Sequence, residues 1–247
     1  MRAVSRGVTQ ARGESFVASE SRLALGAPLP DWTPRPAPQP LTIEGRYCRV
    51  EPLDMARHGD DLIAAFRATE IASWTHLFVG PFADDDAIRT WLTGCANSDS
   101  YVYFAVIDRA SGRAGGVCAY MRPDPANGVV EIGSIHYADL LKRKPATTEA
   151  MYLLMRYVFD DLGYRRYEWK CNAFNTPSRR AALRLGFRFE GIFRNHLVVK
   201  GHNRDTAWFS VIDSEWPALR AIFEGWLAPE NFDNEGRQRK SLAAFRG

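Results

Sequence analysis

Residues 167–191 read YEWKCNAFNTPSRRAALRLGFRFEG, and this stretch decides the fold class. Apolar and polar side chains alternate strictly over residues 167–173, which predicts a strand with one buried face. Thr176 and Pro177 are expected as an N-cap followed by a proline at the first helical position, and Gly186 as the end of that helix. A strand that leads directly into a helix indicates an α/β protein.

The flanking sequence predicts a mixed order of further strands and helices. Val129–Tyr137 is expected as a strand, and Thr148–Leu162 as a helix closed by Gly163. Two more strands follow residue 186 and turn near residues 200–203. The other predicted elements are strands at Tyr47–Pro52, Tyr101–Asp108 and Arg113–Tyr120, and helices at Met55–Ala68, Asp84–Ala96 and Trp216–Leu227.

Changes in composition divide the chain into three segments. Residues 1–40 end in closely spaced prolines, which favour an extended arm and disfavour helix. Residues 41–230 contain the predicted strands and helices and are expected to form one α/β domain. Residues 231–247 are expected as a basic C-terminal tail, because they include Arg237, Arg239, Lys240 and Arg246.

The composition of the 247-residue chain is that of a globular protein, with 46% hydrophobic and 25% charged residues. A formal net charge of +3 is too small to indicate a nucleic-acid partner, and no apolar run is long enough to predict a membrane span. The four cysteines lie far apart and the five histidines lack metal-ligand spacing, so neither a metal site nor a disulfide framework is predicted. Without a secretory signal, a cytoplasmic location is expected.

The first candidate functional stretch is residues 140–150, LLKRKPATTEA, between a predicted strand and a predicted helix. A helix N-terminus presents unpaired N–H groups and a partial positive charge, so it can bind an anion. Lys142, Arg143 and Lys144 would add attraction for a polyphosphate. The alternative is an ordinary solvated basic turn.

The second candidate stretch is residues 175–178, at the start of the next predicted helix. Asn175 and Ser178 place an amide and a hydroxyl at this helix end. N-capping by itself accounts for Thr176 and can account for Asn175. It does not account for the whole string that runs on to Gly191.

These two stretches, in this order, resemble the GNAT superfamily of acyl-CoA-dependent N-acyltransferases, in particular its RimJ/RimL-like branch. The resemblance covers roughly residues 41–225 and is carried by the residues at 131–133 (Glu-Ile-Gly), 148–150 (Thr-Glu-Ala), 175–178 (Asn-Thr-Pro-Ser) and 185–191 (Leu-Gly-Phe-x-x-Glu-Gly). It implies a mixed, mostly antiparallel central sheet that is splayed at the cofactor strand and flanked by helices.

The resemblance also implies how acetyl-CoA would be bound. The pantetheine arm would pair with the backbone of the strand that carries residues 131–133, while the next loop and helix N-terminus would bind the pyrophosphate. Asn175 would bond to the arm from its other side, and Ser178 would lie near the sulfur. The strand residues expected to line the arm are Ser134, Ile135, His136 and Tyr137.

The phosphate loop departs from the family pattern. It reads Lys-Arg-Lys-Pro-Ala-Thr at residues 142–147 and lacks both glycines of the family, while its proline removes one N–H donor. This departure bears on cofactor affinity more than on the fold. The groups expected to serve are the amides of Lys144, Ala146, Thr147 and Thr148, with the side chains of Lys142, Arg143 and Lys144.

The reaction that the resemblance implies is direct attack of a primary amine on the acetyl thioester in a ternary complex. A backbone N–H near Ile135 or His136 would stabilise the oxyanion, and Ser178 would protonate the leaving sulfur. RimL-like enzymes carry a basic carboxylate after the Glu-Gly pair, but this chain has Asn-His-Leu at 195–197. The residue that acts as the general base is therefore either His196 or Glu131.

Each candidate base has a structural alternative. His196 can be a packed or surface histidine on a strand, and Glu131 can face solvent or pair with an arginine. A non-catalytic acyl-CoA-binding module is the rival function, supported by the glycine-free loop. A nucleic-acid-associated protein that uses the basic tail is a third reading. The acceptor is open between a protein N-terminus and a small amine, and a homodimer would not be unusual for the resemblance.

Overall fold

The computed structural model describes residues 26–246 of the chain. The chain divides into two compact units, residues 1–32 and 33–247, and every helix and strand reported below lies in the second unit. Within the first unit, the described residues 26–32 contain a turn in which the Trp32 amide donates to the Leu29 carbonyl. The expected arm over residues 1–25 lies outside the described residues. Residues 33–42 contain neither helix nor strand.

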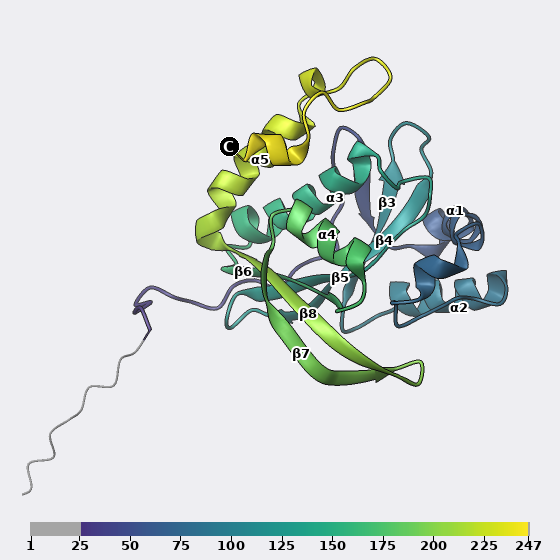
Figure 1. Cartoon of the computed structure of the whole chain (residues 1–247), viewed down its shortest axis with the longest axis horizontal. Coiled ribbons are helices and arrows are strands. Elements are labelled where there is room, and N and C mark those ends of the chain that lie inside the picture. The colour runs from purple at the N-terminus through teal and green to yellow at the C-terminus, as the bar shows by residue number, and fades with distance from the viewer. Residues whose placement is uncertain (1–25, 247) are drawn as a thin grey trace, which may run out of the picture. The chain divides into compact units, whose positions relative to one another are not determined.

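One mixed sheet of eight strands forms the centre of the second unit (Figure 1). The strands lie in the order β1-β2-β3-β4-β5-β6-β8-β7, and every neighbouring pair is antiparallel except β5 and β6. The predicted fold class is therefore confirmed. The strands are β1 (Ile43–Glu44), β2 (Cys48–Pro52), β3 (Val102–Asp108), β4 (Ala114–Asp124), β5 (Val129–Tyr137), β6 (Arg166–Asn172), β7 (Arg188–Val199) and β8 (His202–Ile212).

Strands β5 and β6 separate soon after they begin. They pair only from Val129 to Glu131, whereas β4 stays paired with β5 as far as Tyr137. The register between β4 and β5 shifts within this stretch, and Ser134 has a left-handed φ of 49°. The β5 backbone beyond Glu131 therefore has no β6 partner on one side, which is the splay expected for the cofactor strand.

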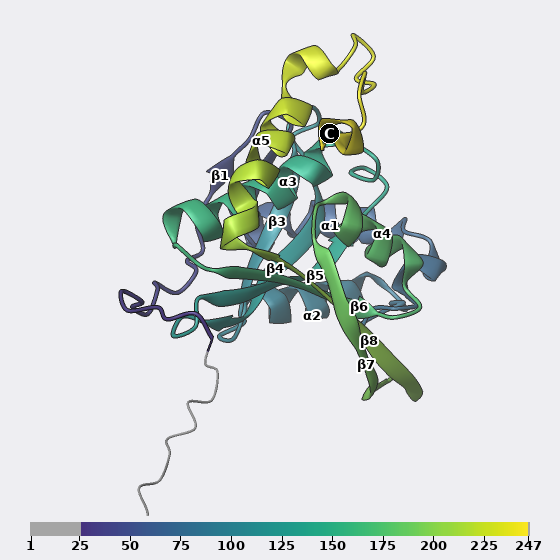
Figure 2. The same ribbon diagram turned by 60° about the vertical axis from the view of Figure 1, so that its left-hand side comes forward.

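Helices cover both faces of the sheet (Figure 2). On one face, α3 and α5 pack on a large core that includes Tyr120, Tyr167 and Phe209. On the other face, α1 and α2 pack on a second core around Phe66 and Ala105. The helices are α1 (Met55–Arg67), α2 (Asp85–Ala96), α3 (Pro145–Arg156), α4 (Thr176–Arg184) and α5 (Trp216–Leu227), with a 3₁₀ turn at Ile71–Trp74 and a π turn at Tyr157–Asp161.

Two predicted helix starts were wrong. α3 begins at Pro145 rather than Thr148, because proline fits the first helical position, where an N–H donor is not needed. α4 is capped by Asn175 rather than Thr176, since the Asn175 Oδ1 accepts from the Ser178 amide at 3.1 Å. The predicted bounds of β5 and α5 agree with the structure.

The hairpin of β7 and β8 turns as expected at Lys200 and Gly201. Both residues have a left-handed φ, 50° and 76°, which a two-residue hairpin turn requires. The hairpin extends past the other strands of the sheet (Figure 1). The Lys200 ammonium donates to the carbonyls of Trp74 at 2.9 Å and Val79 at 3.0 Å, so the hairpin end is bound to the loop before α2.

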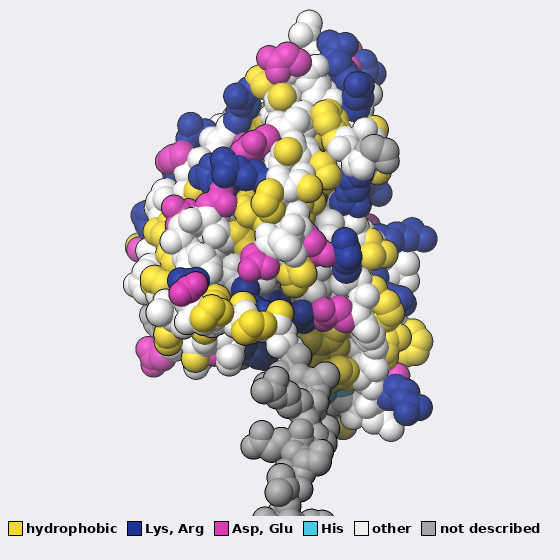
Figure 3. Space-filling view, turned by 90° about the vertical axis from the view of Figure 1, so that its left-hand side faces the viewer, with side chains coloured by type: hydrophobic (Ala, Val, Ile, Leu, Met, Phe, Trp, Pro, Cys, Tyr) yellow, Lys and Arg dark blue, Asp and Glu magenta, His cyan; other side chains and the backbone are white. Residues whose placement is uncertain are grey.

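The C-terminal segment, expected as a basic tail, contains a 3₁₀ turn at Leu242–Phe245 that contacts the core. Leu242 is 1% exposed and belongs to the core beneath α5. The Asn231 side chain donates to the carbonyls of Trp226 and Lys240, which holds the segment in a closed loop. Basic side chains gather at the end of the molecule that carries this segment (Figure 3). Apolar burial therefore decides the path of the chain here, and the charges lie outside.

No helix within residues 26–246 is long and apolar enough to cross a membrane.

Candidate active site

The loop before α3 retains fewer free amides than the sequence suggests. The Lys144 amide donates to the Leu141 carbonyl at 3.2 Å, and the Thr147 amide donates to the Lys144 carbonyl at 3.3 Å. Of the other two expected amides, that of Thr148 lies at the fourth position of α3, where it donates within the helix, so only the Ala146 amide of the expected set stays free. The loop can adopt this path without glycine because Arg143 takes a left-handed φ of 62°.

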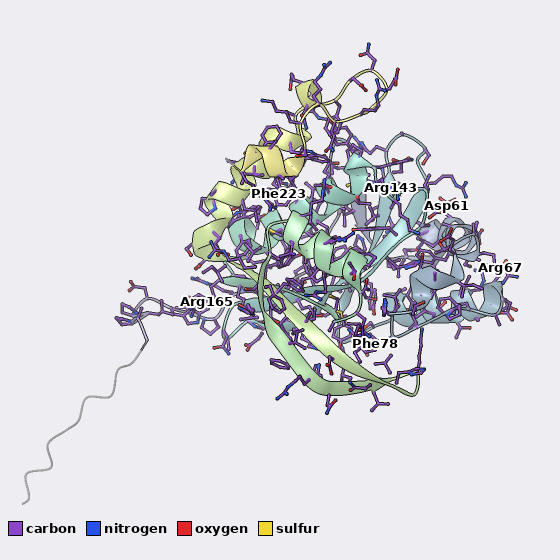
Figure 4. The ribbon with its side chains drawn as sticks, in the orientation of Figure 1. Asp61, Arg67, Phe78, Arg143, Arg165 and Phe223 are labelled. Atoms are coloured by element: carbon purple, nitrogen blue, oxygen red, sulfur yellow. The ribbon has the colours of Figure 1, made fainter. Side chains whose placement is uncertain are left out.

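The three basic side chains of this loop differ in their partners. Lys142 binds the Asp139 carboxylate at 2.8 Å, and Lys144 lies 3.6 Å from the carboxylate of Asp108. Arg143 is exposed and makes no hydrogen bond or ion pair with any residue in the range 26–246 (Figure 4). Arg143 is therefore the cation of the loop that is available to an incoming phosphate.

Arg184, which the sequence analysis missed, lies at the same helix start. It comes from the last turn of α4 and donates from Nη1 to the Thr148 hydroxyl at 2.9 Å. Burial is the main cause that lowers the pKa of Arg184, with a smaller effect from Arg246. Arg246 donates in turn to the carbonyls of Leu183 and Arg184. A cation therefore reaches the α3 N-terminus from an element distant in sequence.

The four β5 residues expected along the pantetheine arm face in different directions. Ser134 and Ile135 are half-buried at the splay, where their backbone lacks a β6 partner. The His136 ring is buried on the α1 side against Trp74, and burial lowers its pKa to about 4. The Tyr137 ring packs against the core beneath α3. His136 can thus serve a ligand only through its backbone.

Ser178 lies at the start of α4, where its hydroxyl has a defined donor. The Trp169 indole donates to the Ser178 Oγ at 3.0 Å, which leaves the hydroxyl proton free to be donated. The Cys171 thiol is within hydrogen-bonding reach of the same hydroxyl. Because the Asn175 Oδ1 caps the helix, the NH₂ group of Asn175 is the part left for a ligand.

Glu131 is buried at the point where β5 leaves β6, within a network of ion pairs. Its carboxylate binds Arg122 at 2.9 Å and Lys170 at 3.0 Å, and Lys170 also binds Glu168 at 2.8 Å. Burial raises the pKa of Glu131, while Lys170 and Arg122 act in the opposite direction. The structural alternative considered for Glu131, pairing with an arginine, is therefore what the structure contains.

His196 lies on β7 beside a backbone bulge at Asn195, which has a left-handed φ of 49°. Its Nδ1 is 3.0 Å from the Thr206 hydroxyl of β8, so Nε2 is the nitrogen left for other contacts. Thr206 and Trp208, two positions apart, point to the same face of β8. The Lys170 ammonium lies 3.9 Å from the Trp208 ring centroid. His196 and Glu131 thus share the sheet face opposite α3.

Metal ligands do not gather anywhere in the described part of the chain. No group of three or more His, Cys, Asp and Glu side chains comes together there, and all four cysteines are buried and free. The Glu131 carboxylate is held by the cations Arg122 and Lys170.

The separation of β5 from β6 and the start of α3 after β5 form the arrangement that the resemblance to the GNAT superfamily implies. Residues 51–188, more than half of the chain, match the family model of the acetyltransferase (GNAT) domain. The chain belongs to the GNAT acetyltransferase family.

Solved structures and a curated relative agree with this membership. A GCN5-related N-acetyltransferase from Brucella melitensis is 58% identical, with a TM-score of 0.86 over 88% of this chain and 99% of that chain. A probable GNAT-family acetyltransferase from Chromobacterium violaceum is 38% identical, with a TM-score of 0.73 over 79% and 98%. The uncharacterized N-acetyltransferase p20 of Bacillus licheniformis is 32% identical over 116 residues, 46% of this chain but only 63% of that relative.

Proposed function

We propose that this protein is an acetyl-CoA-dependent N-acetyltransferase of the RimJ/RimL-like type, which transfers the acetyl group to a primary amine by direct attack in a ternary complex. The acceptor is a protein N-terminus or a small amine. The separation of β5 from β6 after Glu131 carries this proposal, because it leaves strand backbone free to pair with a pantetheine arm. Ser178 lies at the start of α4, where its hydroxyl oxygen accepts from the Trp169 indole.

Cationic groups at the α3 N-terminus support binding of the CoA pyrophosphate. Arg143 and Arg184 would attract the phosphates, and the amide of Ala146 would donate to them. The bound thioester supplies the activated acetyl group. An N–H of the splayed strand near Ile135 would then stabilise the oxyanion.

Two side chains would move protons in the transfer. Ser178 would donate its hydroxyl proton to the leaving sulfur. His196 would accept a proton from the ammonium, since its Nε2 is free and it shares the open sheet face. Glu131 is the weaker candidate, because both Arg122 and Lys170 already bind its carboxylate.

A non-catalytic acyl-CoA-binding module is the second candidate function. It is favoured by the two loop amides, of Lys144 and Thr147, that are engaged within the protein. Such a module would bind CoA and release no thiol.

Thermal unfolding with CoA, followed by a thiol-release assay with acetyl-CoA and a panel of amines, tests both candidates. We expect millimolar CoA to raise the melting temperature, because a ligand that binds only the native state stabilises it. We also expect amine-dependent thiol release. A thermal shift with no amine-dependent release would favour the binding module, and the absence of any shift would contradict both candidates.

A further inference from the structure

Arg204 of β8 is a buried arginine that lacks an acidic partner. Arg204 is only 6% exposed, and its Nε is buried without a hydrogen-bond partner. Within residues 26–246, no hydrogen bond or ion pair holds its guanidinium. The contact that does hold it is the Phe78 ring, whose centroid lies 4.1 Å from the guanidinium carbon.

The nearby carboxylates are already occupied. Glu131 acts on Arg204 only through space and binds Arg122 and Lys170. The neighbouring Asp205 accepts from the Asn195 amide at 2.7 Å and from the Asn203 side chain at 3.0 Å. A buried charge without a partner is unfavourable, so this guanidinium has a use outside the stability of the fold.

Arg204 lies on the same sheet face as the candidate base. One face of β8 carries every second residue of this stretch, namely Arg204, Thr206 and Trp208. The Thr206 hydroxyl is hydrogen-bonded to His196. The Trp208 Nε1 is a second buried donor without a partner on this face. Two unsatisfied donors therefore flank the residue that orients His196.

Phe78 belongs to the loop that covers this face. The same loop contains Trp74, whose ring stacks on His136 of the splayed strand, and it is bound at Trp74 and Val79 by Lys200. In Figure 4, Phe78 lies beside the β7–β8 hairpin, far from Arg143 near the start of α3. The Arg204 guanidinium is thus placed away from the group of cations expected to bind the CoA phosphates.

We propose that Arg204 binds a carboxylate of the amine acceptor, so that the acceptor is an amino acid or peptide-like amine with a nearby carboxylate. This inference rests on the proposed function, because it names the acceptor for the same site. The guanidinium forms a two-point pair with the carboxylate, while the Phe78 ring covers one of its faces. The carboxylate comes either from the C-terminus of a short acceptor or from an acidic side chain near its amine.

Acetylation of matched acceptors tests this specificity. The acceptors are alanine, dialanine and trialanine, each with its C-terminal amide, together with amidated peptides that start with Asp or Asn. Each pair consists of an acceptor with the carboxylate and the matched acceptor in which an amide replaces it. For the wild type we expect, in at least one pair, that kcat/KM is about a hundredfold higher for the acceptor with the carboxylate, which is the scale of a buried charge pair. The pair that shows the preference identifies the source of the carboxylate.

Arg204→Gln should reduce that preference to near unity, and Arg204→Lys should retain only part of it, because lysine lacks the planar fork. Arg194→Gln is the matched control, since Arg194 is an exposed arginine on the same hairpin and its loss should keep the preference. A retained CoA-induced thermal shift would show that each variant is folded. A preference unchanged in Arg204→Gln, or absent from the wild type, would overturn the proposal.

A binding measurement separates this proposal from the proposed function. If the wild type acetylates none of these amines, acetyl transfer to this class of acceptor fails. Calorimetric titration of the N-acetylated acceptors then still decides the role of Arg204. Tighter binding of the carboxylate forms that is lost in Arg204→Gln would support an anion site at Arg204, and equal or absent binding of both forms would refute it.

Discussion

The imidazole of His136 stacks on the indole of Trp74, with ring centroids 3.9 Å apart and planes inclined by 24°. His136 follows the splay of β5, and Trp74 ends the 3₁₀ turn after α1. Phe66 adds an edge contact to both rings. Strand β5 and the loop before α2 are therefore packed together by a neutral, buried histidine.

We predict that this stacking makes stability depend on pH. Burial, with a smaller effect from Lys142, lowers the pKa of His136 to about 4 in the native state, whereas an unfolded histidine titrates near 6.5. Between these values the unfolded chain binds the extra proton, so stability is lost as pH falls through this window, by up to about 3 kcal/mol. Urea unfolding at pH 7 and pH 5 measures the loss.

His136→Phe should remove this part of the pH dependence. His202→Gln, at the exposed hairpin turn, is the control and should leave the difference between pH 7 and pH 5 as in the wild type. Equal pH dependence of His136→Phe and wild type would contradict the prediction.

Ser178→Ala should lower kcat and leave CoA affinity nearly unchanged, because protonation of the sulfur matters only in the transition state. It should also cost about 1–2 kcal/mol of stability, since the Trp169 indole loses its acceptor. Trp169→Phe removes the same hydrogen bond but keeps the hydroxyl, so it should retain kcat. Loss of CoA binding in Ser178→Ala without a further loss of rate would make Ser178 a contact residue.

The two candidate bases predict different pH–rate profiles. If His196 accepts the proton, His196→Gln should remove the rising limb of the pH–rate profile and lower the rate on the order of a hundredfold. Glu131→Gln should mainly lower stability, by about 3 kcal/mol, because Arg122 and Lys170 lose their carboxylate. A fast His196→Gln beside a stable, CoA-binding but inactive Glu131→Gln would transfer the role to Glu131.

Arg184→Gln should weaken CoA binding about tenfold, because it removes a cation from the α3 N-terminus. Arg143→Gln should weaken it less, because Arg143 lacks a hydrogen bond like the one that orients Arg184 on Thr148, and both effects should shrink with added salt since both side chains are exposed. Arg180→Gln is an exposed control on the same α4 helix as Arg184. Calorimetric CoA titrations at low and high salt measure all three, and equal affinities for Arg180→Gln and Arg184→Gln would contradict the assignment.

Glu149 of α3 should prove structural, although it belongs to the motif that supports the family resemblance. Its carboxylate accepts from the amides of Arg46, Tyr47 and Cys48 at 2.7, 2.6 and 2.8 Å, and so holds the turn between β1 and β2. Glu149→Gln should lower the free energy of unfolding by about 2 kcal/mol, because an NH₂ group would then face a backbone N–H. The affinity of the folded variant for CoA should be unchanged. Chemical denaturation measures the loss of stability, and calorimetric titration with CoA under native conditions measures the affinity.

Local patterns in the sequence determined the elements and the family. Strict alternation at 167–173, the helix-ending Gly186 and the Lys200-Gly201 turn act over a few residues, so they could be interpreted without the fold. The start of α3 was missed because a proline reads equally well as a helix breaker and as a first helical residue.

Only the tertiary structure decided which distant groups meet. Arg184 reaches Thr148 from another helix, Glu131 binds two cations from neighbouring strands, and Arg204 is buried under Phe78 without an ion pair to any residue in the range 26–246. Such contacts cannot be predicted from a single residue type or spacing, because they depend on strand register and on the way loops pack across the sheet. The sequence by itself therefore determined the class of chemistry, and the packing of the chain decided which charges remain free to bind a ligand.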